Sequence, residues 1–266
     1  MSHLLRFYLS IATLLSEVSS MNTLQTNGNL EFLYQDDYLL AVNKPAGMIV
    51  HSDGTNERSL TDLVCEKLRA LESSNKIDLS QIQALNRLDK ETTGIVLFSL
   101  KKETQAQFDQ LIASKELSKE YLAVVKGDFG LNKLLIDKAI GKDRHDAQKM
   151  RISDTGKPSQ TEVRLIKVVS SVQGQTQSLL LVNLLTGRKH QIRVHLSSLG
   201  FPLVGDVLYG GMPSLQRKTK KKHRPQPLML HAYRVGFIHP VTGAKIVIKT
   251  DIPRRFSNFG VLEKDL

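Results

Sequence analysis

The residues best suited to chemistry lie in the segment Leu85–Gly94, where a single carboxylate, Asp89, is placed in a turn between apolar runs. Arg87 stands two residues before this aspartate, and a Thr-Thr-Gly turn follows it. The apolar run from Ile95 to Leu100 is typical of a buried strand. A carboxylate on a turn beside a strand is held still, as a catalytic group must be. Aspartate also caps turns, so this segment alone leaves both roles open.

The histidines do not predict a metal site. His190 and His195 are five residues apart, which is not the i, i+4 spacing of a helical zinc pair. No phosphate-binding glycine loop of the Walker or Rossmann type is present in the sequence, and no carboxylate cluster suited to Mg²⁺ is evident. We therefore expect no metal and no cofactor, which makes a metal-dependent nuclease a poor interpretation.

The composition indicates a globular protein with a polyanionic partner. The 266 residues include 41% apolar residues, enough for a substantial core, and 37 Lys and Arg against 26 Asp and Glu give a net charge of +11. Such an excess favours nucleic acid first and an anionic membrane surface second. The one cysteine, Cys65, excludes a disulfide within the chain and favours a reducing cytoplasm. No apolar run is long enough to span a membrane.

Two segments stand apart from the expected domain. Residues 1–29 are predicted to be an N-terminal extension, poorly ordered or a short helix, although residues 7–15 vaguely resemble the apolar part of a signal peptide. Residues 213–227 enclose an uninterrupted basic run. Charge runs are usually solvated loops, and we expect a mobile loop that contacts phosphates. The remaining residues, 30–266, are expected to form one catalytic domain.

The pattern of elements predicts an α+β domain on a mixed, largely antiparallel sheet with flanking helices. Apolar runs and alternation predict strands, and 3.6-residue periodicity predicts helices. Residues 137–160 are basic and are expected to be irregular. Strands are expected at 31–34, 38–43, 49–51, 95–100, 118–127, 162–169, 178–185, 228–238 and 244–250, and helices at Ser59–Leu71, Glu103–Ala113 and from the stripe Ile192, His195, Leu196, Leu199 to a stop at Gly200.

Several stretches, in order along the chain, resemble the RluA/RluD family of RNA pseudouridine synthases. The most specific are LAVNKPAG at 40–47, NRLDKETTG at 86–94, KEYLA at 119–123 and TGRKHQIRVHL at 186–196. The resemblance covers roughly residues 30 to 253 and implies the pseudouridine synthase fold. Where the family usually has His and Ser, this sequence has Asn86 and Thr93. Many relatives carry an S4 RNA-binding domain, for which the residues before Leu30 are too few, so we expect RNA binding to rest on the catalytic domain.

The resemblance also implies roles for individual residues. Asp89 matches the catalytic aspartate, Tyr121 the tyrosine that stacks on the target base, and Arg193 the arginine that pairs with the aspartate. Arg87 matches the residue thought to enter the RNA stack where the target base has flipped out. The residues expected to contact RNA are Arg87, Asn86, Arg188, Lys189, His190, Lys218, Lys220, Lys221 and Lys222.

The implied reaction fits the absence of cofactor motifs. Uridine becomes pseudouridine when the N1–C1′ bond breaks, the uracil turns, and C5 bonds to C1′, so nothing is oxidised or added. Aspartate is ionised at neutral pH and can attack C1′ or remove a ribose proton, and the sequence does not decide between these steps. Tyr121 is also a candidate base, directly or through water, for the C5 proton, although a core aromatic is the plainer interpretation.

The sequence therefore predicts an RNA pseudouridine synthase, with a non-catalytic RNA-binding ribosome-assembly factor as the alternative. The presence of Asp89, Tyr121 and Arg193 together favours the enzyme, because a binder has no chemical need for a buried aspartate among phosphates. We expect rRNA as the substrate, with tRNA as the second class. A cytoplasmic monomer without membrane association is the expected state.

Overall fold

The computed structural model describes residues 30–52, 54, 57–71, 77–114, 116–170, 175–210 and 226–266. The predicted N-terminal extension and most of the basic loop fall outside these ranges. The same holds for four residues expected to bind RNA, namely Lys218, Lys220, Lys221 and Lys222.

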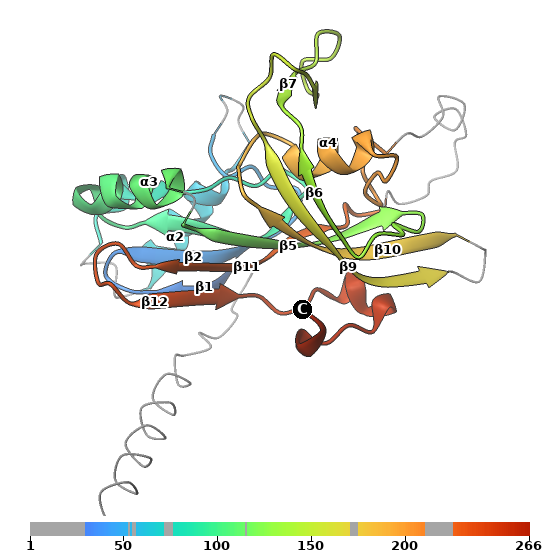
Figure 1. Cartoon of the computed structure of the whole chain (residues 1–266). Helices are drawn as coiled ribbons and strands as arrows, with labels where there is room; N and C mark the ends of the chain where they lie inside the picture. The colour runs from blue at the N-terminus through green and yellow to red at the C-terminus, as the bar shows by residue number, and fades with distance from the viewer. Residues whose placement is uncertain are drawn as a thin grey trace, which may run out of the picture.

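Within these ranges, ten strands form one mixed sheet that runs through the molecule (Figure 1). Its neighbours pair antiparallel except β4 and β11, which run parallel where Thr93 faces His231. The path of the sheet is β1 (Glu31–Gln35), β2 (Leu39–Lys44), β4 (Thr93–Ser99), β11 (Leu230–Ile238), β5 (Ser118–Lys126), β10 (Thr176–Leu184), β9 (Gln160–Ser170) and β6 (Lys133–Asp137), with β3 (Gln83–Ala84) beside β4 and β12 (Lys245–Lys249) beside β11. The predicted α+β class with a largely antiparallel sheet is confirmed.

The central strands are buried on both faces because apolar residues occupy both sets of alternating positions. In β5, Tyr121, Ala123 and Val125 point to one face, as their spacing predicts, and pack in the largest cluster. Leu122 and Val124 point to the other face and pack in a separate cluster. Side chains at the start and end of β4 are buried as well. The middle of the sheet is therefore a rigid base for residues at its strand ends.

Helices and 3₁₀ segments cover the two faces. On the face that carries Tyr121, the sheet packs against α2 (Leu60–Ala70) and α4 (Gln191–Ser198). On the other face lie α3 (Gln105–Ala113) and the C-terminal 3₁₀ helix η5 (Arg254–Phe259). Figure 1 shows α4 and the C-terminal segments on opposite sides of β5, β9 and β10. Shorter 3₁₀ helices are η2 (Leu79–Gln81), η3 (Lys102–Thr104) and η6 (Glu263–Asp265).

Local sequence signals correctly predicted where α2 begins and where α4 ends. Ser59 and Asp62 form the predicted cap of α2, with each side chain bonded to the other residue's backbone N–H. Gly200, at φ +87°, ends the α4 segment as expected. None of the helices in the described ranges is long and apolar enough to cross a bilayer.

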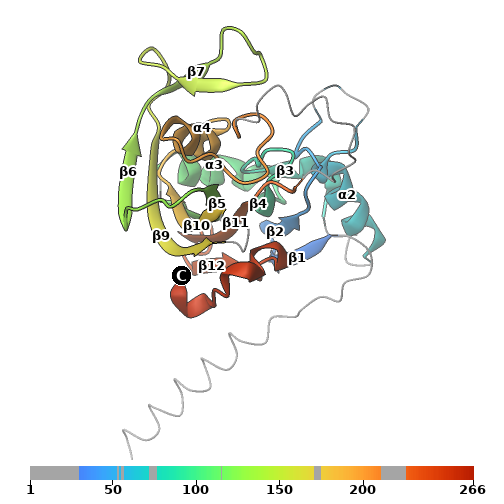
Figure 2. The same cartoon turned by 90° about the vertical axis from the view of Figure 1, so that its right-hand side faces the viewer.

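Two expectations about secondary structure were wrong. Ile49 and Val50 do not belong to a strand, because their carbonyls accept hydrogen bonds from the first N–H groups of α2, at 2.8 and 3.2 Å. Residues 137–160 are not wholly irregular, since β7 (Ile140–Lys142) and β8 (Met150–Ile152) form a two-stranded sheet. These strands are short and only partly buried, so they lack the apolar alternation that reveals a strand in sequence. Figure 2 shows β7 beyond the sheet on the side of α4.

Candidate active site

Asp89 lies in the turn between β3 and β4, which is closed by one internal hydrogen bond and is tied by another to the segment after β2. The backbone N–H of Thr92 donates to the Asp89 carbonyl at 3.0 Å, and the N–H of Gly47 donates to the Lys90 carbonyl at 2.9 Å. Gly94, at φ +112°, brings β4 against β11 so closely that a Cβ there would lie 2.2 Å from the Ala232 carbonyl oxygen. The parallel contact of the two strands therefore requires glycine.

Lys44 is a fully buried cation beneath the same turn. Its ammonium group donates to the carbonyls of Pro45, Lys90 and Thr92 at 2.8 to 2.9 Å. Burial lowers the pKa of Lys44 to about 8, against the raising effects of Glu91 and Asp89. Three carbonyls satisfy all three N–H groups, so Lys44 clamps the segment that carries Asp89. The sequence analysis quoted this lysine in a motif but gave it no role.

Replacing Lys44 with Met is expected to lower kcat by about 10- to 100-fold, because the Asp89 turn loses the donors to its Lys90 and Thr92 carbonyls and with them its fixed position. Backbone amide exchange at Thr92 and Gly47 should accelerate, since their hydrogen bonds hold the same turn. Lys133→Met is the matched control, because its side chain is exposed and its ammonium pairs with Glu162 near the surface. Unchanged protection of both amides in Lys44→Met would show that the turn holds itself.

Arg193 of α4 joins Asp89 to a second carboxylate, Asp206. Its Nη1 donates to Asp89 Oδ2 at 3.1 Å, while its Nε and Nη2 donate to the two oxygens of Asp206 at 2.8 Å each. Asp206 Oδ1 also accepts the backbone N–H groups of Leu208 and Tyr209 at 2.9 and 3.0 Å. Asp206 is thus the structural counter-ion of Arg193, whereas Asp89 accepts one hydrogen bond from it and keeps Oδ1 available.

The burial of the three groups supports this division. The side chains of Asp206 and Arg193 are 0% and 7% exposed, and that of Asp89 is 23% exposed. Burial alone would raise the pKa of Asp206, but the hydrogen bonds and charge of Arg193 and the two backbone donors bring it below its ordinary value. The sequence analysis missed this pairing. Asp206 lies in the stretch PLVGD at 202–206, which also resembles the family, but the sequence analysis gave this aspartate no role.

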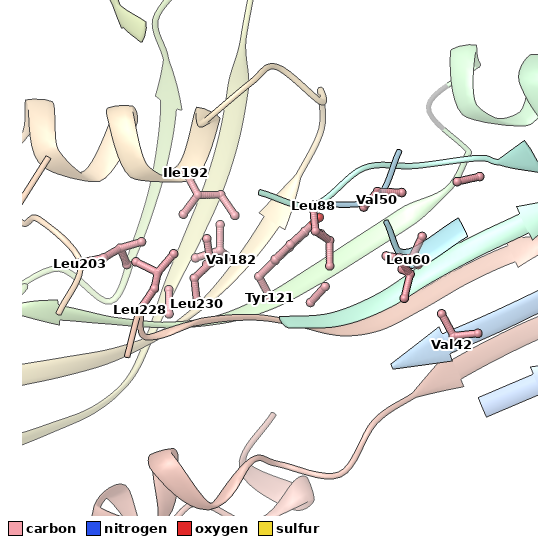
Figure 3. Close-up of a cluster of buried hydrophobic side chains, with 14 of the residues drawn as sticks. Val42, Val50, Leu60, Leu88, Tyr121, Val182, Ile192, Leu203, Leu228 and Leu230 are labelled. Atoms are coloured by element: carbon pink, nitrogen blue, oxygen red, sulfur yellow. The ribbon is translucent and has the colours of Figure 1, made fainter. Parts of the chain in front are cut away.

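The side chain of Tyr121 extends from β5 to the region of Asp89 and Arg193. Figure 3 shows its ring between Leu88 and Leu230, with apolar side chains around it. Burial and then the charge of Asp89 raise the pKa of Tyr121, so the hydroxyl keeps its proton at neutral pH. Tyr121 is 6% exposed. It therefore offers a fixed aromatic face next to the carboxylate.

These side chains surround a cleft with an empty volume of about 350 Å³, which includes the solvent at its mouth. It is concave and mixed in character, with apolar walls and several charged groups, as small-ligand sites are. Its lining comes from the Asp89 turn, β5, β10, β11 and α4, and the lining residues are Arg87, Leu88, Asp89, Thr92, Tyr121, Leu184, Arg188, His190, Gln191, Ile192, Arg193 and Leu230. The structure thus brings Asp89, Tyr121 and Arg193 together, as the sequence predicted.

The residues expected to contact RNA divide into two groups. Arg87 and Arg188 are exposed at the cleft, and His190 lies in its wall, with Nε2 3.8 Å from Asp89 Oδ1. Lys189 is exposed but does not line the cleft. Asn86 is turned to β4, where it accepts the N–H of Leu97 at 2.8 Å and donates to the Ile95 carbonyl at 3.3 Å. Its amide is therefore used to pin the turn to the sheet.

Behind the cleft, Thr93 belongs to a chain of hydrogen bonds. The Arg255 guanidinium donates to Thr93 Oγ1, which is also hydrogen-bonded to His231 Nδ1 at 2.6 Å. His231 Nε2 is hydrogen-bonded in turn to Thr250 Oγ1 at 2.7 Å. Burial lowers the pKa of His231 to about 3, which keeps the ring neutral. The hydroxyl at position 93 therefore links the first residue of β4 to β11 and η5.

His195 has a structural role on α4. It is fully buried, accepts the Thr161 hydroxyl at 2.8 Å and donates to the Lys138 carbonyl at 2.9 Å. Burial lowers the pKa of His195, consistent with a neutral ring. In the part of the chain that the structure describes, no group of three or more His, Cys, Asp or Glu side chains is placed to hold a metal ion.

Comparison with known proteins shows which family the chain resembles. A model of the RNA pseudouridylate synthase family matches residues 38–198. The chain is 34% identical over 244 residues to an RNA pseudouridine synthase, YhcT, of Bacillus subtilis (strain 168), covering 92% of this chain and 76% of the relative. It is also 34% identical to tRNA pseudouridine synthase C of Pasteurella multocida (strain Pm70), over 85% and 93% of the two chains. A third relative, ribosomal large subunit pseudouridine synthase C of Buchnera aphidicola, is 34% identical over 88% of this chain and 71% of its own.

The fold leads to the same family. The structure of human RNA pseudouridylate synthase domain containing 1 matches with a TM-score of 0.67 and 25% identity, over 86% of this chain and 87% of that one. The matched family region includes the turn of Asp89, the strand of Tyr121 and the helix of Arg193. The chain therefore belongs to the RNA pseudouridylate synthase family.

Proposed function

We propose that this RNA pseudouridine synthase isomerises its target uridine in the cleft at Asp89, with Asp89 acting on the nucleotide, Arg193 orienting it and Tyr121 holding the base. One observation carries this proposal. Asp89 is the partly exposed carboxylate of the cleft, with Oδ2 bonded to Arg193 and Oδ1 without a hydrogen bond from the residues that the structure describes. An ionised, oriented carboxylate with a free oxygen suits both candidate first steps.

Both steps conserve atoms and electrons. Attack of Asp89 Oδ1 on C1′ forms an ester while the N1–C1′ bond breaks and uracil leaves as an anion. Removal of a ribose proton by the same oxygen breaks that bond through an elimination instead. On the first route C5 bonds to C1′ as the C1′–Oδ1 ester bond breaks, and on the second C5 bonds to C1′ as Asp89 returns the proton to the ribose. In either case the C5 proton then leaves, N1 takes a proton, and Asp89 ends as the free carboxylate. Arg193 stays bonded to Asp206 throughout and so returns Asp89 to the same position.

Tyr121 suits the turning of the free uracil. Its ring gives an apolar surface beside Leu230, on which a planar base can rotate without losing contact. Because its hydroxyl keeps its own proton, we propose that Tyr121 orients a water molecule that takes the C5 proton to solvent, while N1 takes a proton from solvent.

The substrate RNA is proposed to be rRNA, with tRNA as the second candidate. Among the relatives described above, one is named for the ribosomal large subunit and one for tRNA. The net charge of +11 suits a folded RNA with many phosphates, which extends beyond one nucleotide. We also propose that the protein acts as a cytoplasmic monomer, which sedimentation of the free protein would check.

The experiment is release of tritium from C5-labelled uridine in bulk RNA that lacks the modification. Tritium leaves C5 only when the new carbon–carbon bond forms, so release reports the reaction itself. We expect release from purified rRNA, and mapping would then identify the position. No release from rRNA or tRNA, with both still bound tightly, would support the non-catalytic assembly factor instead.

Arg87→Ala is expected to slow turnover on structured RNA about tenfold or more, and to change turnover on a short single strand by less than about twofold. Arg87 is exposed at the cleft and is free to enter the stack that the target base leaves, which costs a few kcal/mol to open. A single strand has no such stack. Single-turnover rates on the two substrates test this, with Arg254→Ala on η5 as the exposed-arginine control. Equal losses on both RNAs would contradict the role.

A further inference from the structure

His190 has a backbone conformation that is uncommon for a residue with a side chain. Its φ of 58° and ψ of 19° are left-handed, and within the described ranges it is the one residue other than glycine with positive φ. It immediately precedes α4, and its carbonyl accepts the N–H of Val194 at 2.9 Å. Such conformations persist when the surroundings hold them, and they gather at functional sites.

The surroundings that hold the ring are Tyr209 and the backbone of β8. His190 Nδ1 lies 2.8 Å from the Tyr209 hydroxyl oxygen, which also accepts the N–H of Met150 at 2.8 Å. A backbone N–H can only donate, so the hydroxyl oxygen accepts it and the hydroxyl hydrogen can point to His190 Nδ1. In that arrangement Nδ1 accepts, and Nε2 carries the hydrogen of the neutral ring.

Nε2 faces the reactive carboxylate. It lies 3.8 Å from Asp89 Oδ1, the oxygen that Arg193 does not bond. This distance is too long for a hydrogen bond and short enough for an electrostatic contact. A contact at this distance can orient Oδ1 and still leave free the lone pairs that a nucleophile or base needs. The charged groups that act on His190 are Asp89, Arg193, Lys189 and Asp206.

We propose that His190 is a positioning residue for Asp89, held in its Nε2–H form by the Tyr209 hydroxyl, so that the placement of the β7–β8 hairpin controls the orientation of the catalytic carboxylate. The β7–β8 hairpin is part of this arrangement because Met150, whose N–H donates to the Tyr209 hydroxyl, is the first residue of β8. Its position on the side of α4 is visible in Figures 1 and 2. The inference rests on the proposed role of Asp89.

The kinetic test compares His190→Asn, Tyr209→Phe and the double variant. Asparagine tolerates the left-handed conformation, so this change removes the ring while keeping the backbone. We expect kcat on the RNA substrate to fall at least about tenfold in each single variant, with KM changed by less than about twofold. Because Tyr209 acts through His190, the double variant should be no slower than His190→Asn alone. Ser198→Ala, on the exposed part of α4, is the control and should be unchanged.

The second measurement does not depend on activity. Nitrogen-15 chemical shifts of the His190 ring should show the Nε2–H form in the wild type and a mixture of both forms in Tyr209→Phe. An Nδ1–H ring in the wild type, additive kinetic losses, or a normal kcat in His190→Asn would each overturn the inference. These results are distinct from failure of the proposed function, in which the wild type itself releases no tritium and the inference falls with it.

Discussion

Asp89→Asn is expected to reduce tritium release from C5-labelled uridine by at least about 10⁴-fold, because an amide has no charge and cannot serve as the nucleophile or base. The amide keeps the shape of the side chain and can still accept a hydrogen bond from Arg193, so the cleft should retain its form. Affinity for the RNA should therefore stay within a few-fold of the wild type.

Single-turnover release measures the first effect, and a filter-binding assay at fixed salt measures the second. Asp251→Asn, at an exposed position after β12, is the control for loss of one negative charge. Equal release by wild type and Asp89→Asn would mean that another group carries the chemistry. Asp206 is a poor substitute, because its side chain is fully buried and both its oxygens are bonded to Arg193.

Arg193→Met is expected to lower the free energy of unfolding by about 3–5 kcal/mol, because it leaves the buried Asp206 carboxylate without its counter-ion. It should also nearly abolish activity, since Asp89 loses the donor that orients it. Arg193→Lys should remain strongly impaired, because an ammonium group cannot match the parallel donors that a guanidinium offers to Asp206. Denaturant unfolding and tritium release measure the two effects.

The contribution of Asp206 to the pH dependence of stability should have opposite signs in the wild type and in Arg193→Met. In the wild type the pKa of Asp206 is lowered by folding, so its contribution is present above its unfolded pKa and is lost as pH falls through the folded value. In Arg193→Met, burial without the arginine should raise the folded pKa above the unfolded one. The variant should then gain stability relative to wild type as pH falls from about 7 to 5.

Two control variants separate the effect of Arg193 on stability from its effect on activity. Arg234→Met removes an arginine whose side chain is 41% exposed and pairs with Glu120 at the surface, and it should cost no more than about 1 kcal/mol. The double change Arg193→Met with Asp206→Asn should recover most of the stability, because no buried charge is left unpaired and the amide oxygen can still accept the N–H groups of Leu208 and Tyr209, yet remain inactive. Recovery of activity in the double variant would show that Arg193 serves the fold alone.

The sequence by itself determined the elements whose signals are local. The capping pair Ser59 and Asp62 predicted the start of α2, and alternation predicted which side chains of β5 share the face of Tyr121. Caps and side-chain alternation depend on neighbours within a few residues, so they can be recognised in the sequence alone. The ordered motifs also identified Asp89, Tyr121 and Arg193, which the structure gathers at one cleft.

Only the tertiary structure decided what surrounds these three residues. Asp206 pairs with Arg193, Lys44 clamps the Asp89 turn, and His190 adopts a left-handed conformation against Tyr209. Lys44 and Thr92 are 48 positions apart, and the parallel contact of β4 with β11 joins residues even more distant in sequence. These partners come together only when the sheet forms, and each buried polar group must then have a hydrogen-bond partner. No local sequence pattern shows these pairings. The sequence therefore predicted the candidate reactive groups, and only the fold revealed which residues hold them.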